Sequence, residues 1–174
     1  MNEKKNSNRR ISHTWEYLNA IGVRELPPLT SAFDPGYDVG TLVGHLEQSH
    51  HLISVLKISM ACWQVADETS TRAKIDAARK LKIPVCTGGG PFEIAVYFGK
   101  LNEFLDLCAA IGVTRIEAGE GFIDLNLKPR EVIKAAEERN LDVQFEVGKK
   151  HGGSFESDIV KEHIQQGLEW LEAG

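Results

Sequence analysis

A carboxylate, a glycine and two lysines stand together in residues 141–150 (LDVQFEVGKK). Apolar and polar residues alternate from position 141 to 147, which predicts a β-strand. On such a strand Gln144 and Glu146 share the face opposite to the apolar side chains. If the apolar face packs on helices, Glu146 points into the centre of the sheet, where an unpaired carboxylate is costly. Lys149, Lys150 or a metal ion would neutralise it; the alternative is a surface strand with a solvated Glu–Lys pair.

The elements that must position these residues follow from the apolar pattern of the whole chain. Strands are predicted at residues 29–33, 51–59, 83–87, 113–118 and 141–147. Helices are predicted at residues 12–21, 38–47, 67–82, 100–111, 128–140 and 158–172. Strand and helix therefore alternate with short links, which predicts an α/β fold with a parallel sheet and right-handed crossovers.

Polar and glycine residues gather after the predicted strands, and in a parallel sheet these positions share one edge. They are Asp34, Lys57, Gly88 to Glu93, Glu117 to Gly121 and Glu146 to Lys150. Three of them, Glu93, Glu117 and Glu146, would repel one another there unless a hard divalent cation such as Mg²⁺ lay between them. The alternative is that one or more of these glutamates turns to solvent.

The glycine run Gly88-Gly89-Gly90 has two readings. Ahead of a helix, its backbone N–H groups could bind a phosphate. The run lacks the spacing of the dinucleotide-binding and Walker motifs, and glycine after a strand more often forms only a tight turn.

Composition and charge exclude several classes of protein. The chain has 174 residues, enough for one domain with a closed core, and a net charge of −5 with a pI near 5.7 argues against nucleic acid as a partner. No apolar run approaches the ~20 residues that span a bilayer, so no membrane partner is expected.

Residues 1–11 are predicted to be a disordered polar tail, and residues 12–174 a single domain. Three widely spaced cysteines form no disulfide or metal pattern and suggest a reduced, cytoplasmic protein.

Three segments of the chain, together with the distances between them in the sequence, resemble one known family. They are CTGGGPFE at 86–93, RIEAGEG at 115–121 and FEVGKK at 145–150, and the likeness to the phosphosulfolactate synthase family covers about residues 24–174. The resemblance implies a TIM barrel that adds sulfite to phosphoenolpyruvate with Mg²⁺, on the archaeal route to coenzyme M. The family also has bacterial and plant relatives associated with heat stress.

The resemblance also implies roles for individual residues. Mg²⁺ would be held by Glu93, Glu117 and Glu146, and would bind the substrate carboxylate. Lys57 would pair with the substrate phosphate or carboxylate, and Lys150 would deliver a proton to C3 after sulfite adds to C2. The substrate-binding set is completed by Asp34, Gly88, Gly89, Gly90 and Lys149.

The chain departs from the family pattern at several points. GGGPFE stands where family members usually read GGTLFE, and Lys57 is followed by ISMAC instead of the family's glycine- and tryptophan-containing loop. Five βα units are recognisable instead of the eight of a barrel, which predicts an incomplete barrel. Because an open sheet leaves unpaired edges, a homo-oligomer is expected.

Two other functions remain open. Lys57 or Lys150 could serve as the Schiff-base nucleophile of an aldolase-like lyase. Alternatively, the chain could be a non-catalytic relative that acts in stress protection or assembly, which the altered loop after Lys57 favours.

Overall fold

Five parallel strands form the centre of the molecule, in the order β1-β2-β3-β4-β5. The computed structural model describes residues 13–24, 29–150 and 157–174; the predicted tail lies outside them. The strands are β1 (Thr30–Asp34), β2 (Ile53–Ile58), β3 (Val85–Cys86), β4 (Arg115–Gly119) and β5 (Asp142–Glu146). Each strand pairs with the next along the chain, as in part of a TIM barrel, and this confirms the predicted fold class.

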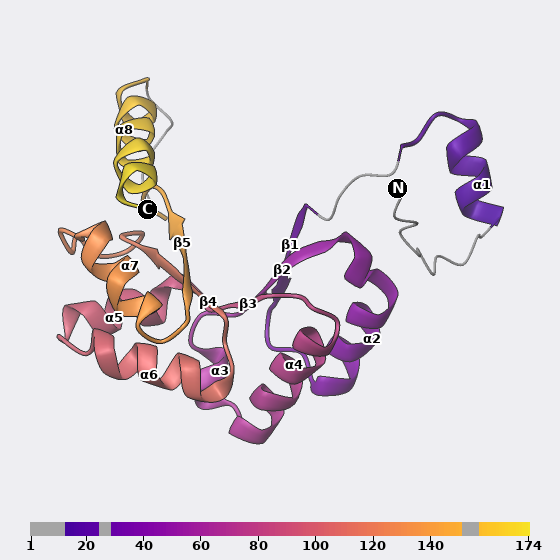
Figure 1. The fold of residues 1–174 in the computed structure, drawn as a ribbon, viewed down its shortest axis with the longest axis horizontal. Coiled ribbons are helices and arrows are strands. Elements are labelled where there is room, and N and C mark those ends of the chain that lie inside the picture. Colours follow the sequence, from indigo (N-terminus) through magenta and orange to yellow (C-terminus); the bar gives the residue numbers. More distant parts are fainter. Residues whose placement is uncertain (1–12, 25–28, 151–156) are drawn as a thin grey trace, which may run out of the picture.

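The helices that connect the strands cover one face of the sheet, whereas α1 precedes β1 and buries no residue, and α8 follows β5 (Figure 1). The helices are α1 (His13–Ala20), α2 (Val39–Ser49), the 3₁₀ turn η1 (His50–Leu52), α3 (Cys62–Val65), α4 (Glu68–Lys80), α5 (Gly89–Tyr97), α6 (Leu101–Ile111), α7 (Pro129–Glu137) and α8 (Ser157–Ala173). The main apolar core lies between this helical layer and the strands, where residues such as Leu56, Ile75 and Ile116 are buried. The opposite, inner face of the sheet is the one that would line a barrel.

Several predicted helix ends are confirmed in detail. Asp38 caps α2 by accepting a hydrogen bond from the backbone N–H of Thr41, and Asp67 caps α4 in the same way through Ser70. Gly112 ends α6 in the left-handed region, at φ 93°.

The segment after β3 differs from the prediction. No helix was predicted between residues 88 and 99, but α5 begins at Gly89, inside the glycine run. Pro91 is tolerated there because the first turn of a helix needs no backbone donor at that point. Gly88 is required for a packing reason, since an added Cβ would lie 2.8 Å from Cα of Met60.

The register of the last two strands decides which side chains face inward. Glu117 pairs with Gln144, and Gly119 pairs with Glu146. Since paired residues of parallel strands point to the same side, these positions share the inner face. The alternating residues, among them Ala118 and Phe145, belong to the apolar core or pack against it. The predicted inward direction of Glu146 is therefore confirmed.

Among the described residues, no helix is both long and apolar enough to cross a bilayer. The cytoplasmic location stays a prediction.

Candidate functional site

A buried ion pair lies on the inner face of the sheet, at the carboxyl ends of β2 and β4. Nζ of Lys57 donates to both carboxylate oxygens of Glu117, at 2.6 and 2.7 Å. The Glu117 side chain is 4% exposed and that of Lys57 is 20% exposed. The backbone N–H of Gly89 donates to Oε1 of Glu117 at 2.9 Å, so the first residue of α5 fixes the same carboxylate. Three elements thus hold one charged pair in place.

A second carboxylate meets Glu117 above Gly89. A Cβ added to Gly89 would lie 3.2 Å from Oε1 of Glu117 and 3.3 Å from Oε2 of Glu146. Any larger residue at position 89 would therefore push against both carboxylates. Glu117 and Glu146 therefore lie beside the same glycine, and their role as metal ligands stays a prediction.

Glu146 is paired with Lys150. Nζ of Lys150 lies 3.0 Å from Oε2 of Glu146, but the contact lacks hydrogen-bond geometry. Oε2 is therefore buried with an ionic neighbour and no hydrogen-bond donor within the described ranges. The same ammonium lies 5.1 Å from the ring centroid of Phe122, within the range of a cation–π contact. Phe122 is a site residue that the sequence analysis missed, although it directly follows the glycine-containing turn after β4.

Glu93 holds the loop that follows β4. Its carboxylate is 1% exposed, and Oε2 accepts hydrogen bonds from the backbone N–H groups of Phe122 and Ile123, at 2.8 and 2.9 Å. Oε1 is buried and has no hydrogen-bond partner in the described part of the chain. A Cβ at Gly121 would lie 3.4 Å from this oxygen and 3.0 Å from Cγ of Lys150. Glu93 and Lys150 therefore flank the same glycine.

Two predicted site residues point elsewhere. The carboxylate of Asp34 accepts from the backbone of Gly36 and Tyr37 and pairs with Lys74 of α4 at 2.9 Å. Asp34 pairs in register with Ile58, which is part of the core, so it faces the helical layer. Lys149 donates to the backbone oxygen of Glu120 and to Asp124 on the outside of the loop. The structure brings neither Asp34 nor Lys149 to the inner cluster, by which we mean Lys57, Glu93, Glu117, Glu146 and Lys150.

The fit of a metal ion rests on the oxygens that lack donors. Carboxylate oxygens are the ligands that Mg²⁺ prefers, and Oε1 of Glu93 and Oε2 of Glu146 are buried without a hydrogen bond. Three carboxylates (Glu93, Glu117 and Glu146) face only two ammonium groups (Lys57 and Lys150), which leaves excess negative charge. In this arrangement, however, the described residues contain no group of three acidic, histidine or cysteine side chains placed to hold a metal. The donor chemistry fits Mg²⁺, but Lys57 and Lys150 now contact carboxylate oxygens that would otherwise bind the ion.

A thiol lies beside the ion pair. Cys86 of β3 is in register with Lys57 on one side and with Arg115 on the other, and so faces inward. Burial raises the pKa of the Cys86 thiol to about 12, and the negative charge of Glu117 adds to this rise. The thiol is therefore held in its neutral form, which makes Cys86 a poor nucleophile at neutral pH.

Comparison with known proteins identifies the family. The model of the family described as (2R)-phospho-3-sulfolactate synthase (ComA) matches residues 27–174. The chain belongs to this family. It is 32% identical over 123 residues to a phosphosulfolactate synthase of Methanocaldococcus jannaschii, a match covering 70% of this chain and 49% of that protein. It is 23% identical, again over 123 residues, to the phosphosulfolactate synthase of Methanothermobacter thermautotrophicus, covering 70% of this chain and 48% of the relative.

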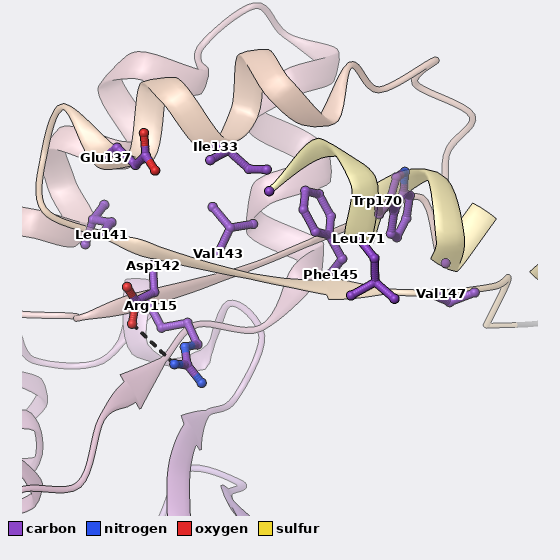
Figure 2. Close-up of a pocket in the computed structure, with 12 residues that line it drawn as sticks. Arg115, Ile133, Glu137, Leu141, Asp142, Val143, Phe145, Val147, Trp170 and Leu171 are labelled. Carbon is purple, nitrogen blue, oxygen red and sulfur yellow. Dashed lines mark hydrogen bonds and ion pairs between the residues drawn. The ribbon is translucent and has the colours of Figure 1, made fainter. Parts of the chain in front are cut away.

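The chain spans about half the length of the curated relatives it matches. All of the inner cluster, from Lys57 to Lys150, lies within the part that matches the phosphosulfolactate synthase family. A cavity of about 570 Å³ lies elsewhere, between α7, α8 and the outer side of β5 (Figure 2). This cavity is lined mainly by apolar side chains, and the inner cluster is not part of it.

Proposed function

We propose that the inner-face cluster binds an enolpyruvate phosphate and catalyses the addition of sulfite to it. The observation that carries this proposal is the placement of Lys57 and Lys150 beside converging glutamates, in a chain of the phosphosulfolactate synthase family. Phosphoenolpyruvate and sulfite are both anions, so a site for them needs ammonium groups at the point of reaction. Strand ends of a parallel sheet are where such barrels carry their chemistry.

The product named by the family sets the direction of addition. In a 2-phospho-3-sulfolactate the sulfonate is on C3 and the phosphate ester is on C2. The sulfur lone pair therefore forms a bond to C3, the C2=C3 π electrons move onto C2 and the carboxylate, and a proton arrives at C2. The phosphate ester stays intact. The opposite order, expected from the resemblance, is wrong for such a product.

Lys150 is the proposed proton donor to C2. Its Nζ lies over the Phe122 ring and beside Oε2 of Glu146 without a hydrogen bond, so it is free to turn toward a substrate. Lys57 is the proposed binding group for the substrate carboxylate. The N–H of Gly89 holds Glu117, and Glu117 holds Lys57 in place before the substrate arrives. The entropy cost of ordering the Lys57 side chain during the reaction is therefore lower.

Mg²⁺ is proposed as the cofactor. Glu93, Glu117 and Glu146 would hold it, and when bound it would stabilise the negative charge that develops on the substrate carboxylate. Binding requires Glu117 and Glu146 to share their oxygens between the ion and the lysines.

The geometry does not favour Lys57 as the nucleophile of the Schiff-base alternative. A nucleophilic lysine must offer a free lone pair to a carbonyl carbon. Nζ of Lys57 instead donates to both oxygens of Glu117. Trapping with borohydride and a carbonyl substrate should therefore leave Lys57 unmodified.

The test is ³¹P NMR of phosphoenolpyruvate incubated with sulfite, Mg²⁺ and this chain. We expect a new phosphate ester signal that requires sulfite, and its loss in Lys57→Met. Lys80→Met changes an exposed lysine of α4 and should behave as wild type. Phosphoenolpyruvate that stays unchanged, at protein concentrations where it binds, would contradict the enzymatic proposal and favour a binding protein.

A further inference from the structure

The loop between β4 and α7 contacts the side chain of Lys150 along its length. The backbone N–H of Lys150 donates to the backbone oxygen of Gly121 at 2.9 Å, so the base of the side chain is fixed to this loop. A Cβ added at Gly121 would lie 3.0 Å from Cγ and 3.2 Å from Cε of Lys150. The aliphatic part of Lys150 therefore passes close to Gly121, and a larger residue at position 121 would displace it.

The next residue of the loop meets the charged end of the same side chain. Nζ of Lys150 lies 5.1 Å from the centroid of the Phe122 ring, where the negative face of an aromatic ring attracts a cation. Oε2 of Glu146 lies 3.0 Å from the same nitrogen, without a hydrogen bond. Both contacts attract the ammonium, but neither fixes the direction of its N–H bonds. The ammonium is therefore kept in one place while its protons stay available for a substrate.

Glu93 holds the backbone that carries the Phe122 ring. Oε2 of Glu93 accepts from the N–H groups of Phe122 and Ile123, at 2.8 and 2.9 Å, and the side chain is buried. Such charge-assisted hydrogen bonds are stronger than neutral ones, and burial protects them from water. Because Glu93 belongs to α5, the loop after β4 is tied to the neighbouring βα unit. The ring therefore has a fixed support beside the ammonium.

We propose that Phe122 is a positioning residue for Lys150, whose ring keeps the ammonium where a proton can reach the substrate. This inference rests on the proposed function, in which Lys150 donates that proton to C2. Proton transfer requires donor and acceptor at hydrogen-bond distance, ~2.6–3.2 Å. A long lysine side chain without such a guide would spread over several rotamers and spend less time at that distance. A cation–π contact suits this task, because it attracts the ammonium without accepting one of its protons.

Apolar packing is the competing role for Phe122, and two substitutions separate the roles. Phe122→Leu keeps an apolar side chain but removes the negative face of the ring. Phe122→Tyr keeps both the apolar contact and the ring face. A residue that acts only by packing should tolerate leucine about as well as tyrosine, whereas a positioning residue should tolerate only tyrosine.

Steady-state kinetics with phosphoenolpyruvate, sulfite and Mg²⁺, in any form of the chain with measurable activity, test the positioning role. Phe122→Leu should lower kcat roughly 3–30-fold, the range that a cation–π contact supplies. KM for phosphoenolpyruvate should change little, because Lys57 is the proposed group that binds its carboxylate. Phe122→Tyr should restore kcat to within about twofold of wild type.

Phe98→Leu is the matched control. Phe98 is an exposed aromatic residue that follows the last residue of α5 and contacts Tyr97. It lies nine residues after Gly89, about 13 Å along the helix from the inner cluster. This variant loses an aromatic ring outside the proposed site, so its kcat and KM should equal those of wild type.

NMR of protein labelled with ¹³C at the ε carbon of lysine gives a second measurement, which needs no turnover. Methylene protons over an aromatic ring resonate upfield, so the Lys150 signal should lie upfield of the other lysines. Its absence in Lys150→Arg assigns it. The signal should move downfield in Phe122→Leu and stay in place in Phe122→Tyr. Phe122 is 45% exposed, so both variants should fold, which far-UV circular dichroism checks.

The results separate this inference from the reaction itself. A Lys150 signal that does not move in Phe122→Leu overturns the inference, because the contact is then missing in solution. A wild-type chain that turns over, with kcat unchanged in Phe122→Leu or not restored in Phe122→Tyr, overturns the inference and leaves the proposed function intact. Absence of turnover in every form contradicts the proposed function, and with it the role of Phe122, even where the contact is observed.

Discussion

Two buried pairs of a carboxylate and a lysine occupy the two faces of the same sheet. Asp34 and Lys74 lie 2.9 Å apart on the side of the helices, with side chains 3 and 13% exposed. Glu117 and Lys57 lie 2.6 Å apart on the inner side, with side chains 4 and 20% exposed. Distance and burial alone make them nearly equivalent.

The surroundings of the two pairs are different. Asp34 accepts two backbone hydrogen bonds from the turn that leads into α2, in addition to its contact with Lys74. The carboxylate is thus fully used in joining a strand, a turn and a helix. Glu117 instead shares Gly89 with Glu146, while Glu93 lies with Lys150 beside Gly121. Glu146 and Glu93 each have a buried oxygen that lacks a hydrogen bond in the described residues.

The comparison shows how a structural pair differs from a functional one. A structural pair balances its charges and satisfies its oxygens, so that nothing is left for a ligand. A binding site retains unsatisfied groups that a ligand completes, at a cost in stability. On this criterion the inner cluster is the candidate site, whereas the pair of Asp34 and Lys74 stabilises the fold.

The largest effect is expected from Lys150→Ala. If Lys150 donates the proton, its removal should lower the turnover rate roughly 10²–10⁴-fold, as expected for a general acid. Lys149→Ala should change the rate much less, because Lys149 is tied to Asp124 outside the cluster. Steady-state kinetics give the turnover rates of both variants, in any form of the chain with measurable activity. Equal losses of turnover in the two variants would contradict the assignment of Lys150 as the proton donor.

The second prediction exchanges one partner of each pair and measures stability. Asp34→Asn should lower the free energy of unfolding by about 3 kcal/mol, because it leaves the ammonium of Lys74 buried beside a neutral amide. Glu117→Gln should lower the free energy of unfolding by about 1 kcal/mol, since Lys57 is more exposed than Lys74 and the change removes a like charge beside Glu146. Urea denaturation gives both values. A larger loss for Glu117→Gln would reverse the assignment of roles.

The third prediction compares two buried thiols, Cys86 on the inner face and Cys108 in the helical core. Burial raises the pKa of each to about 12. A thiol with a raised pKa stays protonated when folded but ionises when unfolded above about pH 9, so its stabilisation is complete below pH 9 and is lost as the pH rises toward 12. Because of each cysteine, the free energy of unfolding should fall by about 1–2 kcal/mol when the pH rises from about 8 to about 10.5.

Urea midpoints at these two pH values, in Cys86→Ala and Cys108→Ala, measure this loss. Each variant should show a smaller alkaline loss than wild type. A loss of unchanged size in either variant would mean that its thiol is not protected by burial.

The smallest effect concerns Mg²⁺. At a concentration about five times its dissociation constant, the ion should stabilise the fold by about 1 kcal/mol through mass action. Glu146→Gln should abolish this gain, while Asp34→Asn should preserve it. Thermal melts with Mg²⁺ and with EDTA make the comparison. Identical midpoints at all concentrations would remove the metal from the proposed site.

Much of the fold was predictable because its signals are local. Alternation placed Glu146 inward, but it left open whether Lys149 or Lys150 would neutralise it, because β5 ends at Glu146. Asp38, Asp67 and Gly112 marked helix ends through their own capping chemistry. The start of α5 at Gly89 was missed, because a glycine run has low intrinsic helix propensity and is stabilised here by tertiary contacts.

The pairing of charges was not predictable from periodicity. Strand phase says which face a carboxylate takes, but not whether its neighbour is a cation or another carboxylate. Asp34 was therefore assigned to the site, although its register with Ile58 turns it to the helices. Glu93 was expected only as a metal ligand, and its hydrogen bonds to Phe122 and Ile123 depend on a loop whose path the sequence does not reveal.

The most direct test of the inner cluster is an amide NMR titration with phosphoenolpyruvate, with and without Mg²⁺. The account predicts shifts at residues that surround the cluster, such as Gly89, Gly121 and Lys150. Gly36 and Tyr37, whose amides bind Asp34, should not move. The experiment needs no turnover, so it separates binding from catalysis. Shifts concentrated at Gly36 and Tyr37, or no shifts at millimolar ligand, would contradict the assignment of the site to the inner face.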